Sequence, residues 1–151
     1  MNRPGLFITL FFLIGFGFLG YQSLFPPDNV GHSMDQPDLT DIGAGEAIAV
    51  VAVPETFSET AQIGKNIFEA NCAACHGINA AGQNGVAPPL VHRIYEPSHH
   101  SDMSFILAAR NGVRAHHWNF GNMPIIEGLT EGDVKMIARY VRELQQANGI
   151  F

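Results

Sequence analysis

The sequence Cys72-Ala73-Ala74-Cys75-His76 places two thiols around two small residues, with an imidazole directly after the second thiol. This order is typical of covalent haem attachment, because each Cys can add to a vinyl group of the haem as a thioether. The His that follows can then place a ring nitrogen under the iron. The motif therefore predicts a c-type haem attached to Cys72 and Cys75, with His76 as a ligand of the iron.

Two other kinds of site contain a Cys-x-x-Cys pair, and this sequence fits both less well. A thioredoxin-like redox site follows a strand in a βαβ pattern, whereas residues 59–71 have the pattern of a helix. A structural zinc site needs four ligands, usually with a second pair of Cys or His at short spacing. The chain has 2 cysteines, and both lie in the motif, so no further Cys is available as a zinc ligand or for a disulfide framework.

The charge is acidic and unevenly distributed along the 151 residues, with a formal net charge of -6. Arg3 is the only charged side chain in residues 1–25, whereas residues 26–54 contain several acidic residues and no basic one. Nothing in this distribution resembles a basic nucleic-acid-binding surface. It predicts three parts: an N-terminal anchor over residues 1–25, an acidic, Pro-containing linker over residues 26–54, and a haem domain over residues 55–151.

Residues 5–25 are almost wholly apolar and uncharged. As a helix they would span about 31 Å, close to the thickness of the hydrocarbon core of a bilayer. Arg3 lies before the run and acidic residues follow it, so the positive-inside rule places the N-terminus in the cytoplasm. We expect a single-pass helix in the bacterial inner (cytoplasmic) membrane, with the haem domain in the periplasm.

A cleaved signal peptide is the alternative for this segment. Its apolar region would be shorter, and a small-x-small cleavage site should follow it. The sequence Tyr21-Gln22-Ser23-Leu24-Phe25 is a poor cleavage site, which favours an uncleaved anchor. The linker that follows has the composition of a flexible tether, except for the apolar run over residues 47–53, which we expect to lie extended against the domain.

Helical periodicity predicts three helices after residue 55, over residues 59–71, 101–111 and about 130–148. Ser58 and Ser101 are expected to cap the first two of these helices. The third begins with Thr130 and Asp133 in the spacing of a capping box. Its apolar residues recur on one face at Val134, Ile137, Val141 and Leu144.

Together with the haem motif, this arrangement resembles the monohaem class I c-type cytochromes. In that family the N-terminal helix crosses the C-terminal helix at a small residue and an aromatic residue, and Gly64 and Phe68 match that pattern. The resemblance implies an all-α cytochrome c fold, in which three to four helices surround one covalently bound haem c. Here a single N-terminal transmembrane helix is expected to precede it.

The resemblance also implies two further contacts with the haem. In Ala87-Pro88-Pro89-Leu90, the Pro88 carbonyl would accept a hydrogen bond from the proximal imidazole, although Ala87 stands where the family usually has Gly. In Asn119-Phe120-Gly121-Asn122-Met123-Pro124, Met123 would give its sulfur to the iron opposite His76. Arg110, Arg114 and Trp118 would donate to the haem propionates. For the Arg residues surface ion pairing is an equally good interpretation, as core packing is for Trp118.

Two histidine pairs, His99-His100 and His116-His117, are outside this pattern. Four imidazoles could hold a second metal such as copper. Adjacent residues do not easily share one ion, however, so polar loop histidines near the haem rim are the favoured interpretation. An intermediate hypothesis is that they tune the haem with pH, because His titrates near neutrality.

These features predict a membrane-tethered one-electron carrier in a respiratory or photosynthetic chain, and not an enzyme. The partners implied by the family are a quinol–cytochrome c reductase, a terminal oxidase or a dehydrogenase. One alternative is a dedicated haem subunit of a larger periplasmic oxidoreductase complex. Another, less favoured, is a haem peroxidase in which Met123 dissociates to admit a substrate.

Overall fold

The computed structural model describes residues 3–25 and 35–151. The chain divides into two compact units, residues 1–33 and 34–151, and we describe each by itself. The first part of the expected linker, residues 26–34, lies outside the described residues.

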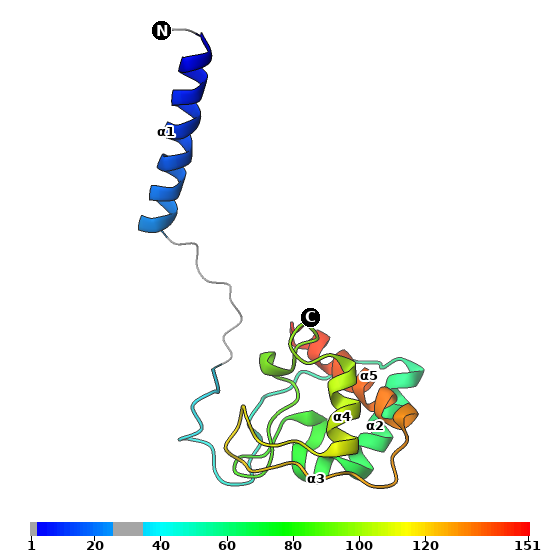
Figure 1. Cartoon of the computed structure of the whole chain (residues 1–151). Coiled ribbons are helices and arrows are strands. Elements are labelled where there is room, and N and C mark those ends of the chain that lie inside the picture. The colour runs from blue at the N-terminus through cyan, green and yellow to red at the C-terminus, as the bar shows by residue number, and fades with distance from the viewer. Residues whose placement is uncertain (1–2, 26–34) are drawn as a thin grey trace. The chain divides into compact units, whose positions relative to one another are not determined.

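The first unit contains one helix, α1, over Arg3–Leu24 (Figure 1). Its described large apolar side chains are exposed, among them Phe11 at 73% and Phe16 at 67%. No helix in the described ranges, residues 3–25 and 35–151, is long and apolar enough to cross a membrane. The membrane span expected from the sequence therefore stays a prediction.

The second unit is helical and is built around the crossing of two helices. Helix α2, Glu59–Asn71, packs mainly against α5, Glu131–Ala147 (Figure 1). Gly64 lies at the closest approach, where an added Cβ would be 1.9 Å from the carbonyl oxygen of Met136. Phe68 is fully buried beside it, with its ring centroid 5.5 Å from that of Tyr140. The helix crossing expected at Gly64 and Phe68 is thus confirmed.

Helix α4, Asp102–Asn111, completes the framework of long helices. It packs on α5 through a small buried group that consists of Ile106, Ala109 and Val134. Short helices connect these elements: α3 over Ala73–His76, η1 over Ile78–Ala80 and η2 over Arg93–Tyr95. Within residues 3–25 and 35–151 there is no strand, only two isolated β-bridges. The expected all-α class is therefore confirmed for the domain.

All three expected capping residues occupy the N-cap positions, and the side chains of two of them accept a capping hydrogen bond. The Ser58 side chain accepts a hydrogen bond from the Ala61 amide, 3.2 Å away. Thr130 and Asp133 form the reciprocal capping box at the start of α5. At α4, Ser101 occupies the expected N-cap position, but its side chain makes no capping hydrogen bond.

Before α2, residues 45–52 lie against the helices and loops of the second unit. The amides of Ile48 and Ala49 both donate to the Ala81 carbonyl. Farther along, Ala52 and the side chain of Asn148 exchange two hydrogen bonds, of 2.9 and 2.8 Å. These bonds explain why the apolar run over residues 47–53 is extended along the domain, as expected.

Candidate cofactor site

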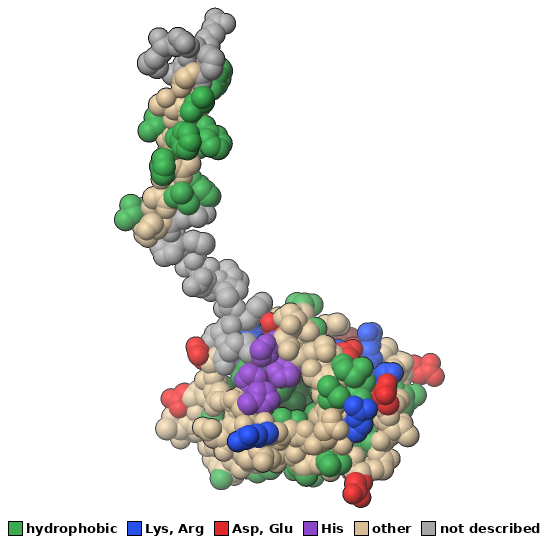
Figure 2. All heavy atoms as spheres, viewed as in Figure 1, with side chains coloured by type: hydrophobic (Ala, Val, Ile, Leu, Met, Phe, Trp, Pro, Cys, Tyr) green, Lys and Arg blue, Asp and Glu red, His purple; other side chains and the backbone are tan. Residues whose placement is uncertain are grey.

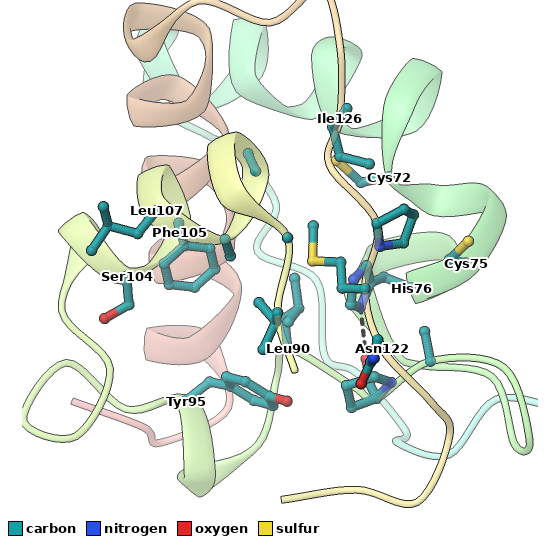
Figure 3. Close-up of a pocket in the computed structure, with 18 of the residues that line it drawn as sticks. Cys72, Cys75, His76, Leu90, Tyr95, Ser104, Phe105, Leu107, Asn122 and Ile126 are labelled. Carbon is teal, nitrogen blue, oxygen red and sulfur yellow. Dashed lines mark hydrogen bonds between the residues drawn. The ribbon is translucent and has the colours of Figure 1, made fainter. Parts of the chain in front are cut away.

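A mostly apolar cavity of about 480 Å³ lies between the α2–α3 corner, α4 and the loop that leads to α5. In Figure 3, Cys72 and His76 line one side of it, while Phe105 and Leu107 of α4 line the opposite side. Its volume and apolar lining are typical of a pocket for a cofactor or another small ligand.

Helix α3 positions the two thiols and the imidazole around one short turn. Cys72 ends α2, and its carbonyl accepts the backbone N–H of His76 at 2.9 Å, which closes the turn of α3. Both thiols are free and line the cavity. Burial, and to a smaller extent the charge of the neighbouring Cys75, raise the pKa of the Cys72 thiol to about 11. At neutral pH Cys72 is therefore a protonated thiol.

His76 is held in one orientation by the backbone of the next loop. Its Nδ1 lies 2.9 Å from the Pro88 carbonyl oxygen, so Nδ1 carries the proton and Nε2 keeps its lone pair. Burial lowers the pKa of His76, although the hydrogen bond to Pro88 opposes this shift. A neutral imidazole with one nitrogen anchored and the other free is the form that binds metal ions.

Gln83 supports this turn, a role that no sequence pattern indicates. Its side-chain amide donates to the carbonyls of Ala73, Ala74 and Cys75 at distances between 2.9 and 3.3 Å. The Ala73 carbonyl also accepts the backbone N–H of Gly77 at 2.9 Å, whereas carbonyls in the last turn of a helix generally need partners from outside it. Gln83 therefore stabilises the backbone that carries the second thiol and the imidazole.

Met123 lines the same cavity, on the loop between α4 and α5. It exchanges two backbone hydrogen bonds with Val113, of 2.9 and 3.0 Å. Gly112 has a φ of +70°, and an added Cβ there would lie 2.7 Å from the Met123 carbonyl oxygen. The Asn122 side chain accepts from the Ala115 amide at 2.9 Å. The backbone of Met123 is thus fixed on both sides.

The three residues considered for propionate contacts do not share one location. Trp118 is 5% exposed and lines the cavity. Its indole N–H is buried and makes no hydrogen bond within residues 3–25 and 35–151; it approaches the Tyr95 hydroxyl without hydrogen-bond geometry. Arg110 and Arg114, by contrast, are exposed, and neither is among the described residues that line the cavity.

Tyr95 is a further polar residue of the cavity that the sequence did not indicate. Burial raises the pKa of its hydroxyl far above the usual range, so the group stays a neutral hydrogen-bond donor. Two thiols, a free imidazole nitrogen, a thioether and a buried indole N–H without a partner thus meet in one apolar cavity. This set of groups fits a metalloporphyrin with acidic side groups.

Comparison with known proteins agrees with this chemistry. The model of the family described as cytochrome c matches residues 61–145. A cbb3-type cytochrome c oxidase subunit CcoP from Helicobacter pylori is 35% identical over 83 residues, which are 55% of this chain and 27% of that protein. The same subunit from another strain of this organism matches equally over 26% of its length. The matched region is therefore about a quarter of these relatives.

Proposed function

The chain belongs to the cytochrome c family, which implies a covalently bound haem c, and from this premise we propose that it is a one-electron carrier with a single haem. In this proposal Cys72 and Cys75 hold the haem through thioethers. His76 and Met123 would be the two protein ligands of the iron. Haem c supplies the ferric–ferrous couple, and the protein sets its potential and its accessibility.

The observation that carries this assignment is the hydrogen bond between His76 and the Pro88 carbonyl, beside a cavity that also reaches both thiols. The bond fixes the imidazole and makes its free nitrogen a better electron donor to a metal. The Met123 thioether is neutral and soft, so it favours the ferrous state and a high potential. The apolar cavity wall excludes water and acts in the same direction.

The two protein ligands leave no coordination position open, which fits electron transfer better than substrate chemistry. The enzyme alternative, a peroxidase, would need the sixth position to open. Trp118 and Tyr95 provide buried donors near the cavity, and we propose the haem propionates as their acceptors. The exposed Arg110 and Arg114 would reach the propionates only from the rim.

The direct test is to express the chain with export and haem maturation, and to measure its mass and its haem-to-protein ratio. We expect one haem per chain that survives denaturation, and a six-coordinate low-spin spectrum. A Cys72→Ala, Cys75→Ala double variant should lack the covalent haem. A colourless wild-type protein of unmodified mass, or a high-spin spectrum, would contradict the proposal.

We also propose that α1 associates the carrier with a membrane, with the haem domain in the periplasm. The support is its exposed apolar side chains over a helix of 22 residues. Detergent should be needed to extract the full chain, whereas a chain that lacks residues 1–25 should be released in soluble form. Equal release of both forms would contradict membrane attachment, and so would a mature N-terminus after residue 25.

A second candidate function is that of a haem subunit in an oxidase complex, and the similarity to CcoP favours it. A mobile carrier would instead exchange electrons with a reductase, an oxidase or a dehydrogenase by collision. Mild solubilisation and size-exclusion chromatography separate the two candidates. Co-migration of this haem with oxidase activity supports a subunit, and migration as a small species supports the mobile carrier.

A further inference from the structure

Four histidines form one cluster on the surface, which we call the histidine cluster: His99, His100, His116 and His117. The first two precede α4 and the other two follow it, so the fold joins segments about eighteen residues apart in sequence. Figure 2 shows histidine side chains gathered on one face, beside a hollow with hydrophobic side chains. The side chains of the two pairs therefore lie together in one cluster.

The distances within the cluster suit a metal ion. The Nε2 atoms of His99 and His117 are 3.4 Å apart. Two nitrogens bound to one tetrahedral zinc ion at about 2.0–2.1 Å lie about 3.3–3.4 Å from each other. His99, His100 and His117 can each offer one nitrogen such that all three lie within 4.8 Å of one another. Small side-chain rotations would bring the third nitrogen to the same centre.

We propose that His99, His100 and His117 bind one divalent transition-metal ion of the kind that prefers imidazole, Zn²⁺ or Cu²⁺. Neighbouring residues in one pair cannot easily share an ion by themselves, but here the third nitrogen comes from the other side of α4. Three imidazoles leave the fourth position to water, as in other zinc sites with three protein ligands.

The backbone already orients one of these ligands. His100 Nδ1 lies 2.6 Å from the Ile94 carbonyl oxygen, so Nδ1 carries the proton and Nε2 is free to bind. Metal-binding histidines usually have such a partner on the second nitrogen. The Gln36 side chain also donates to the backbone carbonyl of His117. This hydrogen bond connects the loop that contains His117 to the segment around Gln36.

The charge state of the cluster agrees with metal binding. Burial lowers the pKa of His100, and the hydrogen bond to the Ile94 carbonyl opposes this shift. The charges of His99, His116 and Arg142 lower this pKa further. Burial, and then His116, His100 and His99, lower the pKa of His117. Both are neutral near pH 7, so no proton has to leave before their nitrogens bind an ion.

The cluster also adjoins the proposed haem site. His100, His116 and His117 line the cavity that contains Cys72 and Met123. A divalent ion beside the cavity would stabilise the more electron-rich ferrous state and raise the haem potential. This consequence rests on the proposed function, whereas the binding of the ion itself does not.

The test uses the untagged holoprotein, stripped with a chelator and titrated calorimetrically with Zn²⁺ and separately with Cu²⁺. We expect saturation at one ion per chain, with tighter binding of Cu²⁺. His99→Ala and His117→Ala should each weaken binding by at least about tenfold, since even the loss of a supporting partner has an effect of this size. His92→Asn, at a described histidine outside the cluster, should bind as wild type.

A plain hydrogen bond between His99 and His117 is the competing explanation. Absence of saturable binding would support it and overturn the proposal, and so would unchanged binding by both cluster variants. The haem spectrum, recorded on the same samples, reports folding and tests the proposed function separately. A redox titration with and without Zn²⁺ should give a higher potential with the ion, and an unchanged potential would contradict its place beside the haem.

Discussion

Gly64 of α2 meets the backbone of Met136 in α5 so closely that a Cβ atom would be 1.9 Å from the Met136 carbonyl oxygen. The contact involves backbone on both sides, so no side-chain rotation can relieve it. Helix α2 also ends at the first thiol of the haem motif. The spacing of these two helices therefore sets the position of one wall of the cavity.

Gly64→Ala should force α2 and α5 apart and lower the free energy of unfolding by about 1–3 kcal/mol or more. Gly132→Ala is the matched control in α5, because an added Cβ there meets only the Thr130 hydroxyl oxygen, at 3.6 Å. The control should be neutral or more stable by up to about 1 kcal/mol, as Ala favours helix over Gly. Urea unfolding of the three proteins provides the comparison, and equal midpoints would show that the crossing tolerates a methyl group.

Met123→Ala should remove the proposed soft sixth ligand, lower the reduction potential and allow carbon monoxide to bind quickly to the reduced protein. Met103→Ala is the control, because Met103 is 52% exposed and does not line the cavity among the described residues. Redox titration and carbon monoxide mixing measure both effects. If the two variants have the same spectrum and potential as wild type, another group ligates the iron.

The helix crossing at Gly64 and Phe68 was an expectation from the family resemblance, whereas the starts and the periodicity of the helices depend on local signals. Gly64 and Phe68 lie one turn apart, and the capping box at Thr130 spans only four residues. The bond between His76 and Pro88 was an expectation from the resemblance, and the structure has that geometry at 2.9 Å. Their roles toward the haem remain a proposal.

Contacts between distant segments were not predictable in this way. Nothing in the sequence around Gln83 indicates that its amide would reach three carbonyls of α3, because that depends on the path of the loop. The four paired histidines were considered together as a metal site, but polar loop histidines were the favoured interpretation, because the meeting of the two pairs depends on where α4 begins and ends. Ser101 has the residue type of a cap but makes no capping bond.

Arg142 also connects segments that are distant in sequence, and its substitution should lower the free energy of unfolding. It is 6% exposed, and its guanidinium donates to the Asp102 carboxylate at 2.8 Å and to the Tyr95 carbonyl at 2.7 Å. It also donates to the His100 carbonyl. Arg142→Met would remove a donor to the His100 carbonyl and one of the two donors to the Tyr95 carbonyl, whereas the Asp102 side chain is 65% exposed and stays solvated. We therefore expect a loss of about 1–3 kcal/mol in unfolding free energy.

Arg139→Met is the control for Arg142, since the Arg139 side chain is 52% exposed in its ion pair with Glu143. The Glu143 side chain is 13% exposed, but without Arg139 it keeps its two hydrogen bonds from Ser58. Loss of this half-exposed pair should therefore cost about 0–1 kcal/mol. Thermal and urea unfolding should therefore separate the two variants clearly. Similar losses for both would mean that the buried hydrogen bonds of Arg142 contribute little net stability.

Acidification should weaken the start of α5 through Asp133. Hydrogen bonds from the Thr130 side chain and then its backbone lower the pKa of this carboxyl below its usual value of 3.8. Because the folded state favours the carboxylate, the stabilisation is full above the unfolded pKa and is lost as the pH falls through the folded pKa. Asp133→Asn should thus be less stable than wild type at pH 6, and this difference should shrink at pH 3. A difference that stays constant between these two pH values, measured by urea unfolding, would mean that the cap does not depend on the charge of Asp133.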